Sequence, residues 1–459
     1  MLIPLVVAFA FFLEQLDATI ITTAIPDMAR SLDTTALRLN LALTAYMVTV
    51  AVFIPLSGWL ADRFGMRRIF VAAIAVFTLG SVLCGLAWNL QTLVVARVVQ
   101  GFGGAMMIPV GRLILLRSFP RSELARAMTY VALPAILGPT IGPLLGGLFT
   151  STIGWRWIFY VNVPFGAAGI AFAWANVREV PVGPLGRFDL AGFAMCAAIA
   201  ALAEIGMEAL GHRLVPIWVA VALFASCGAM LAVYAGHAAR QMAPVLDLAL
   251  LRVRSFRVAL LIGGVSRIGI NAIPFMLPLL LQVGFGLSPL RSGSITFVSA
   301  LGALFVRSSS VWLLRSLGFD RVLTGNTVLA AIAIAGFALV GESTPEWLLL
   351  GCVFGFGVLR NVQFNMIQTL TYADIPRPAL SRATSLGGVL QQLSMSFGVS
   401  VSATLLALVA GEGGGISVAD FHLVFLMLAG LTALAVPGFM TLTPQDGAAV
   451  SNHVRRSAV

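Results

Sequence analysis

The chain has 459 residues, of which 59% are hydrophobic and only 10% are charged. Soluble domains carry about 25% charged residues and disordered chains are more polar still, so the composition excludes both classes. All 28 basic residues are arginine, and the net charge is +10. They fall mostly in short loops between apolar runs, which favours a polytopic membrane protein over one that binds nucleic acid. The four cysteines lie in apolar runs, which excludes a disulfide scaffold.

Fourteen apolar runs are long enough to cross a bilayer, which takes about 20 helical residues. The connections between them are short and leave no room for a soluble domain. We therefore predict an all-α polytopic membrane protein with transmembrane helices at 3–25, 40–61, 69–88, 92–113, 124–150, 156–176, 189–210, 214–236, 256–284, 289–313, 322–341, 346–370, 382–410 and 419–442.

The arginines predict the orientation of these spans. Nineteen of them lie on the side of the N-terminus and five on the opposite side. Because cytoplasmic loops carry the excess of arginine, we expect both termini in the cytoplasm and an even number of spans. Eight charged residues fall inside the spans, where charge is costly and faces a cavity or a partner. They are Glu14, Asp17, Arg97, Glu204, Glu208, Arg267, Arg307 and Arg360.

Glu14 and Asp17 lie three residues apart and share one face of the first span. Burial and mutual repulsion disfavour their charged forms, so at least one is expected to take up a proton at cellular pH. Asp17 and Arg97 lie at similar depth when counted from the outer ends of their spans. An ion pair between them is either structural or a switch that forms in one state and breaks in another. Glu204 and Glu208 are expected in water at the outer interface.

The loop after the 40–61 span reads G-W-L-A-D-R-F-G-M-R-R over residues 58–68. Gly58 lets helices approach, Gly65 permits a left-handed turn, and Asp62 can cap a helix or pair with an arginine. The alternative is an ordinary basic cytoplasmic loop. Residues 311–321 repeat the pattern weakly with Gly318 but without the aspartate, as two homologous halves would. The candidate functional residues of this loop are Gly58, Asp62, Arg63, Gly65, Arg67 and Arg68.

In the 124–150 span, Gly138, Gly142 and Gly146 recur every fourth residue and make one smooth face for close helix packing. Pro139 and Pro143 bend the same helix. In the C-terminal half, Arg267 and Arg360 lie near mid-membrane; they bind an anionic group or pair with acids across the bundle. The candidates for a polar substrate cavity are Gln100, Arg267, Asn271, Arg360, Asn361 and Gln391.

These motifs resemble those of one transporter family. The loop at 58–68 resembles the G-x-L-a-D-r-x-G-r-r loop of the major facilitator superfamily, and residues 97–101 resemble its R-x-x-Q-G motif. The glycine–proline string at 138–147 resembles the antiporter motif of superfamily drug exporters. Residues 16–26 and 155–166 resemble signatures of the fourteen-helix drug:proton antiporters of the EmrB/QacA type. Where that family has Asn-Val, this chain has Thr22 and Thr23.

The resemblance implies the major facilitator fold: a six-helix bundle at 1–176, two extra spans and a cytoplasmic linker at 177–255, a second bundle at 256–442 and a cytoplasmic tail at 443–459. It also implies sites. Asp17, Glu14 and Arg97 would couple protons, while Gly138, Gly142, Pro143, Gly146 and Gly147 would form the antiporter motif. The candidate residues of the loop at 58–68 would gate transport and are the gating candidates.

The implied function is an antiporter of the inner membrane that exports small amphipathic or hydrophobic compounds in exchange for protons. The alternative is an importer of a small metabolite on the same fold; the span at 124–150 favours export. The sequence has no P-loop, no H-E-x-x-H and no G-x-S-x-G, so we expect no enzyme, no cofactor and no metal. Expected partners are the substrate, protons and lipid, with no nucleic acid. The charge of the substrate and the need for a periplasmic adaptor stay open.

Overall fold

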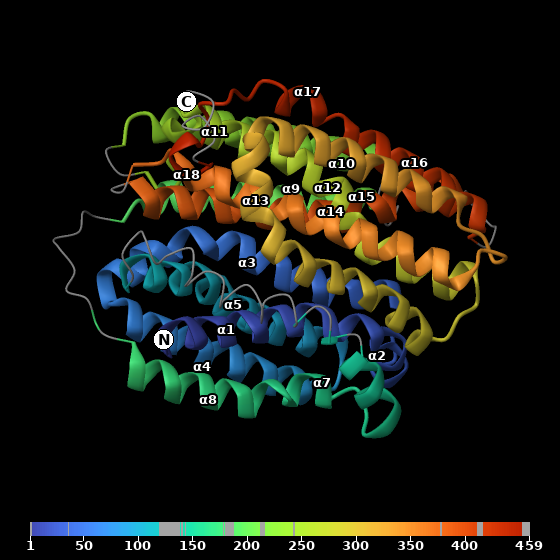
Figure 1. Ribbon diagram of the computed structural model, residues 1–459. Coiled ribbons are helices and arrows are strands. Elements are labelled where there is room, and N and C mark those ends of the chain that lie inside the picture. The colour runs from blue at the N-terminus through green and yellow to red at the C-terminus, as the bar shows by residue number, and fades with distance from the viewer. Residues whose placement is uncertain are drawn as a thin grey trace. The chain divides into compact units, whose positions relative to one another are not determined.

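The computed structural model describes residues 2–34, 36–118, 138, 141–142, 144–177, 179, 188–211, 216–241, 244–376, 379–410 and 416–451. Within these residues the regular structure is helical throughout, and they contain no β-strand (Figure 1). Helices satisfy every backbone N–H and C=O within the segment, which long apolar segments require inside lipid. The predicted all-α class is therefore confirmed.

Helices of the first half of the chain follow one another with short connections. They are α1 (Leu2–Ile20), η1 (Ile21–Thr23), α2 (Ile25–Ser31), α3 (Ala36–Phe64), α4 (Met66–Gly85), α5 (Leu90–Ser118), α7 (Trp157–Tyr160), α8 (Asn162–Asn176), α9 (Leu190–Gly211) and α10 (Ile217–Ala238). Residues 144–152 are also helical.

The second half has the same character, with short π-helical turns at both ends of α12. Its elements are η2 (Leu248–Arg252), α11 (Arg254–Arg257), η3 (Val258–Ile262), α12 (Gly263–Leu279), η4 (Leu280–Gly284), α13 (Pro289–Gly336), η5 (Phe337–Leu339), α14 (Glu346–Ala373), α15 (Leu380–Ala410), α16 (Val418–Ala433), α17 (Val436–Phe439) and α18 (Ala448–Ser451).

Among the described residues, twelve helical segments are long and apolar enough to cross a membrane, and each coincides with one of the fourteen predicted spans. Most of the predicted span at 124–150 lies outside the described residues. The span at 289–313 is helical as part of α13, but only some of its side chains are described. The count of fourteen spans therefore stays a prediction.

Two glycines with left-handed backbone repeat the same turn in the two halves of the chain. Gly65 has a φ of 93° and separates α3 from α4. Gly318 has φ 78° and ψ 170°, and it divides α13 into two helices. Residues other than glycine rarely adopt such backbone angles. The two positions match the loop at 58–68 and its weak copy at 311–321, so the backbone supports the internal repetition that the sequence predicts.

The chain divides into two compact units. Unit 1 comprises Met1–Glu204, Ala225–Leu246 and Thr384–Val389. Unit 2 comprises Ile205–Phe224, Asp247–Ala383 and Leu390–Val459.

In unit 1, α5 packs against α1, α3 and α4, and α8 packs against α1 and α4 (Figure 1). A core of apolar side chains joins them, among them Leu16, Leu93 and Phe159. Missing side chains let α4 and α5 approach closely, because a Cβ on Gly80 would lie only 2.5 Å from the Cα of Gln100. This close approach allows short side chains of α4 to reach polar groups on α5.

In unit 2, α13 packs against α12, α14 and α16. Two apolar clusters fill its interior, one around Phe337, Phe356 and Phe425, the other around Phe319 and Phe439. A Cβ on Gly357 would collide with the backbone of Ser299, so glycine is needed where α14 crosses α13. These contacts fix the depth at which α12 and α14 present their polar residues.

Candidate functional site

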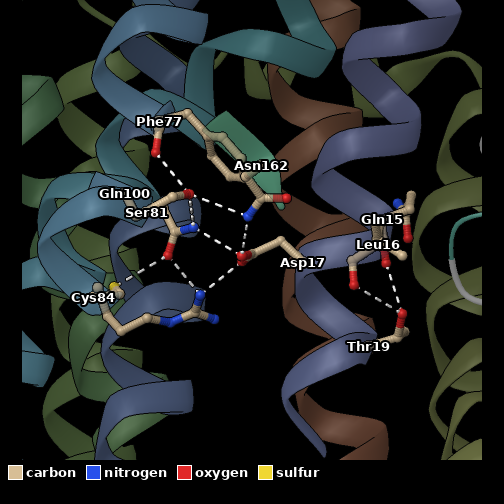
Figure 2. A network of polar contacts seen from close by, with 10 residues as sticks. Gln15, Leu16, Asp17, Thr19, Phe77, Ser81, Cys84, Gln100 and Asn162 are labelled. Atoms are coloured by element: carbon tan, nitrogen blue, oxygen red, sulfur yellow. Dashed lines mark hydrogen bonds and ion pairs between the residues drawn. The ribbon is translucent and has the colours of Figure 1, made fainter. Parts of the chain in front are cut away.

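Asp17 is the centre of a buried polar network in unit 1 (Figure 2). Its side chain has an exposed fraction of 0%, and that of Arg97 on α5 is 1%. Nη1 of Arg97 donates to Oδ2 of Asp17 over 2.7 Å. The ion pair that the equal depths of these residues predict is therefore present, and it excludes water almost completely.

Gln100 lies one turn after Arg97 on α5 and completes the contact. Its Nε2 donates to Oδ1 of Asp17 over 2.8 Å, and its Oε1 accepts from Nη1 of Arg97 over 2.7 Å. Sγ of Cys84 lies 3.6 Å from the same Oε1. Gln100 is fully buried, so the sequence expectation that it faces a substrate cavity does not match its place in this structure.

Ser81 on α4 and Asn162, the first residue of α8, close the network from the other side (Figure 2). Nδ2 of Asn162 donates to Oδ1 of Asp17 over 2.9 Å and to Oγ of Ser81 over 3.2 Å. Oγ of Ser81 also accepts from Gln100 over 2.7 Å and donates to the carbonyl of Phe77. The sequence analysis did not assign either residue to the site. Their polarity within or beside apolar spans was the available signal.

Each hydrogen bond that joins Asp17 to this network is one that its side chain accepts. Its Oδ1 accepts from the amides of Gln100 and Asn162, and its Oδ2 accepts from Arg97. All three partners are donors, and an ionised carboxylate is a pure acceptor. Asp17 is therefore bonded as a carboxylate here, and the three donors occupy three of its four acceptor positions.

Aromatic rings hold the guanidinium of Arg97 from the remaining sides. Its Cζ lies 4.3 Å from the ring centre of Tyr46 on α3 and 6.0 Å from that of Phe159. Such cation–π contacts stabilise a desolvated cation. A Cβ on Gly104 would lie 2.8 Å from the hydroxyl oxygen of Tyr46, so glycine at this position makes room for the ring.

Glu14 lies one turn before Asp17 and has an exposed fraction of only 8%. Its Oε2 is buried and finds no hydrogen-bond partner in the described part of the chain. The charges that act on this carboxyl are those of Arg112 and Asp17. The structure thus places a second acid beside the network, and no donor among the described residues bonds to its Oε2.

The loop between α3 and α4 makes two ion pairs within unit 1. Oδ1 of Asp62 lies 2.7 Å from Nη2 of Arg117, near the end of α5. Nε of Arg67 lies 3.2 Å from Oε2 of Glu179. Of the two roles that the sequence left open for Asp62, the structure shows pairing. The N-cap of α4 is Gly65, and no side chain caps it.

The other gating candidates differ in their exposure. Arg63 and Arg68 are exposed, and Gly58 is partly buried on α3. The side chain of Glu179 lies where a Cβ on Gly65 would stand, so glycine serves both the turn and this contact.

The glycines of the 124–150 span face the helix that carries Asp17. A Cβ on Gly138 would lie 2.9 Å from Cβ of Gln15, and one on Gly142 would lie 3.1 Å from Cβ of Thr19. A Cβ on Gly146 would collide with the carbonyl of Ile20. The predicted smooth face thus packs directly on α1 and on η1 after it.

One other described member of the antiporter string does not share this contact. A Cβ on Gly147 would meet no described atom within 4 Å, so this glycine points away from α1. Pro143 lies outside the described residues, as does Pro139.

The polar candidates of unit 2 do not form one cluster. Nδ2 of Asn361 donates to the carbonyl of Gly357 on its own helix. Asn271 and Gln391 are partly buried on α12 and α15. Arg267 has an exposed fraction of 4%, and its guanidinium lies 5.3 Å from the ring centre of Phe364.

A neutral network that the sequence did not assemble lies beside Arg267. Nε2 of Gln363 donates to Oγ of Ser266 over 3.1 Å and to Oγ1 of Thr327 over 2.8 Å. Its Oε1 accepts from Nδ2 of Asn326 over 2.7 Å. These bonds fasten α12, α13 and α14 to one another at the level of Arg267.

The expectation for Glu204 is wrong. Its exposed fraction is 1%, whereas the sequence placed it in water at the outer interface. Hydropathy gives the depth of a residue but not the direction in which the helix turns it, and α9 turns Glu204 inward. The side chains of Glu208 and Arg307 lie outside the described residues.

Comparisons with known proteins agree with these motifs. Residues 7–399 match the model of the Major Facilitator Superfamily. The chain is 38% identical over 463 residues to a protein of Pectobacterium atrosepticum that carries, provisionally, the name multidrug resistance protein MdtD; the match covers 98% of this chain and 97% of that one. A protein of the same name from Salmonella typhi is 38% identical over 424 residues, covering 92% of this chain and 89% of its own.

Solved structures support the fold. The crystal structure of the human organic anion transporter MFSD10 (TETRAN) matches with a TM-score of 0.69 at 16% identity, covering 95% of this chain and 99% of that one. The nucleoside transporter NupG matches with a TM-score of 0.62 at 14% identity and the same coverage. The family match covers most of the chain and confirms the resemblance seen in the motifs. The chain therefore belongs to the major facilitator superfamily of membrane transporters, together with MdtD.

Proposed function

We propose that this protein is a proton-coupled antiporter of the inner membrane that exports small amphipathic or hydrophobic compounds, with both termini in the cytoplasm. The observation that carries the proposal is the buried pair of Asp17 and Arg97, enclosed by donors, with the acid Glu14 one turn away. Ionisable groups at this depth are costly and serve proton relays in transporters. The names of the MdtD relatives support drug-like substrates.

In this proposal, coupling arises because a proton and the guanidinium of Arg97 compete for the carboxylate of Asp17. With the pair closed, Asp17 is ionised and Arg97 neutralises it. Protonation of Asp17 removes that attraction and leaves Arg97 free to bind another acceptor. Glu14 carries the proton while the pair is closed, because a buried carboxylate with an unpartnered oxygen is unfavourable when ionised.

The glycine face allows a change at Asp17 to move the helix that carries it. Gly138, Gly142 and Gly146 lie against the same helix that carries both acids. A surface without side chains lets α1 shift or rotate with little steric resistance. Breaking or forming the Asp17–Arg97 pair can therefore be converted into a movement of α1, as alternating access requires.

The test is substrate-induced proton release from purified protein in detergent, measured with a pH-sensitive dye. Wild type is expected to release protons when an exported compound is added. Asp17→Asn, which mimics the protonated form permanently, should abolish this release. Asp27→Asn removes an acid from an exposed pair with Arg30 and serves as the matched control.

Export by everted vesicles supplies the second readout. Asp17→Asn and Glu14→Gln should each abolish proton-driven uptake of the compound, whereas the Asp27→Asn control should transport normally. Full proton release from Asp17→Asn would show that Asp17 is not the coupling residue. Wild-type transport that persists without a proton gradient would reject proton coupling itself.

A further inference from the structure

Arg360 lies at the middle of α14, roughly 20 Å from either end of the helix at the rise of about 1.5 Å per residue. The buried residues Val353, Phe356, Gln363 and Ile367 recur at helical spacing and mark the face of α14 that packs into unit 2. Arg360 falls on this face, between Phe356 and Gln363. It is partly buried, so it does not simply extend into lipid from the outer side of the helix.

Within the described residues, Arg360 makes no hydrogen bond and no ion pair. A cation held at mid-membrane without an acceptor is costly, and such residues mark substrate or ion pathways. The guanidinium carries five N–H donors in a planar fork that fits a carboxylate or phosphate.

A second cation lies close by. Phe364 follows Arg360 by one turn on α14, and the guanidinium of Arg267 lies 5.3 Å from the ring centre of Phe364. The hydrogen bond from Gln363 to Ser266 fixes the two neighbouring positions of α14 and α12 against each other. Arg267 therefore contacts the residue one turn after Arg360, which places the two arginines at a similar depth.

The carboxylates that the structure describes in unit 2 all lie at helix ends or in the loops between helices. Most already serve another group: Asp247 pairs with Arg382, Asp446 with Arg254 and Glu346 with Arg291, and Asp420 caps α16. Asp320 begins the second part of α13, Asp374 follows α14, and Glu342 lies in the loop before α14. The described part of unit 2 thus supplies no carboxylate at the depth of Arg360.

We propose that Arg360, with Arg267 beside it, binds the anionic group of the transported compound, so that the substrates include amphipathic organic anions. This inference rests on the proposed transport function and adds the charge of the substrate to it. The carboxylate or phosphate of the compound takes the fork of Arg360, while its apolar body lies against Phe364, whose exposed fraction is 36%. Charge-assisted bonds are strong at such a site because little water competes for them.

The test uses three probes with one ring system and different charges: 1-naphthoate, its methyl ester and 1-naphthylmethylammonium. Their binding to the purified full-length protein is measured by calorimetry at pH 7. We expect wild type to bind 1-naphthoate at least about tenfold more tightly than the other two, as one charged hydrogen-bonding pair predicts. Arg360→Gln should lose this preference, and Arg360→Lys should retain part of it because the charge stays while the fork is lost.

Arg291→Gln is the matched control, because Arg291 pairs with Glu346 at an exposed helix end. It should bind all three probes as wild type does. Equal affinity for the three probes, or undiminished 1-naphthoate binding by Arg360→Gln, would overturn the proposal, as would preference for the ammonium probe. These outcomes are independent of coupling: if everted vesicles still export a compound at the expense of the proton gradient, the antiporter function stands and only the anion site fails.

Discussion

Replacing Asp17 by asparagine should destabilise the protein strongly, because it leaves the charge of Arg97 buried without a counter-ion. Asp17 and Arg97 have exposed fractions of 0% and 1%. Removing one partner of a buried pair costs about 3–5 kcal/mol, compared with about 0–1 kcal/mol for an exposed pair. The Asp27→Asn control, in an exposed pair with Arg30, should therefore change stability little.

The geometry places the expected cost at the lower end of that range. In the wild type, the amides of Gln100 and Asn162 bond to Oδ1 of Asp17. In the variant, Oδ1 of the asparagine can still accept both of these bonds. The new amide nitrogen, however, would face Nη1 of Arg97, and two donors cannot bond to each other. Arg97 would keep its bond to Gln100 and its contact with the ring of Tyr46. We expect a loss of about 3 kcal/mol in the free energy of unfolding.

A double-mutant cycle separates this electrostatic cost from general damage to packing. Asp17→Asn, Arg97→Gln and the double variant are unfolded with SDS in mixed micelles, and the free energy of unfolding is followed by tryptophan fluorescence. The double variant removes the buried charge altogether. It should therefore be more stable than the sum of the single losses predicts, by at least about 2 kcal/mol. Strictly additive losses would show that Asp17 and Arg97 do not interact, and the reasoning on the site would fail.

Three further outcomes are expected. Asp62→Asn should lower the rate of export without preventing membrane insertion, because it removes the 2.7 Å pair with Arg117 at the loop proposed to gate transport; a wild-type rate in everted vesicles would exclude that role. Gly146→Leu should stop transport or cause a proton leak, because its side chain would collide with Ile20 at the end of the helix that carries Asp17. Gly147→Leu, whose side chain would meet no described neighbour at its Cβ, should be tolerated; equal effects of the two changes on vesicle transport would contradict the packing argument. A reporter enzyme fused after Val459 should be active only in the cytoplasm, as the arginine distribution predicts, and periplasmic activity would reverse the topology.

The position of a residue along a helix could be read from the sequence, and two site predictions depended on that position alone. Counting residues from the span ends placed Asp17 level with Arg97, and the structure shows that they pair. The spacing of Gly138, Gly142 and Gly146 predicted a close helix contact, and the structure provides one. In each case the argument needed only the rise per residue and the period of an α-helix.

Direction around a helix could not be read in the same way. Ser81 and Asn162 bond to one another beside Asp17, yet they lie on different helices and 81 residues apart. Asn162 contacts Asp17 directly, and Ser81 contacts it through Gln100. Nothing in their local sequence shows that they face the same point. Glu204 illustrates the converse, since a charge near a span end was expected in water and is buried.

The sequence by itself determined that the chain is a helical membrane protein with arginine-rich loops between its spans, because the bilayer acts on each span separately, through its length, hydropathy and charge. Tertiary structure alone decided which helix Gly138 and its repeats contact, which arginine pairs with Asp62, and that Arg267 lies over Phe364, one turn from Arg360. Those features depend on how each helix is rotated and which helix lies beside it. Rotation and neighbours follow from side-chain packing between segments distant in the chain, and no single segment encodes that packing.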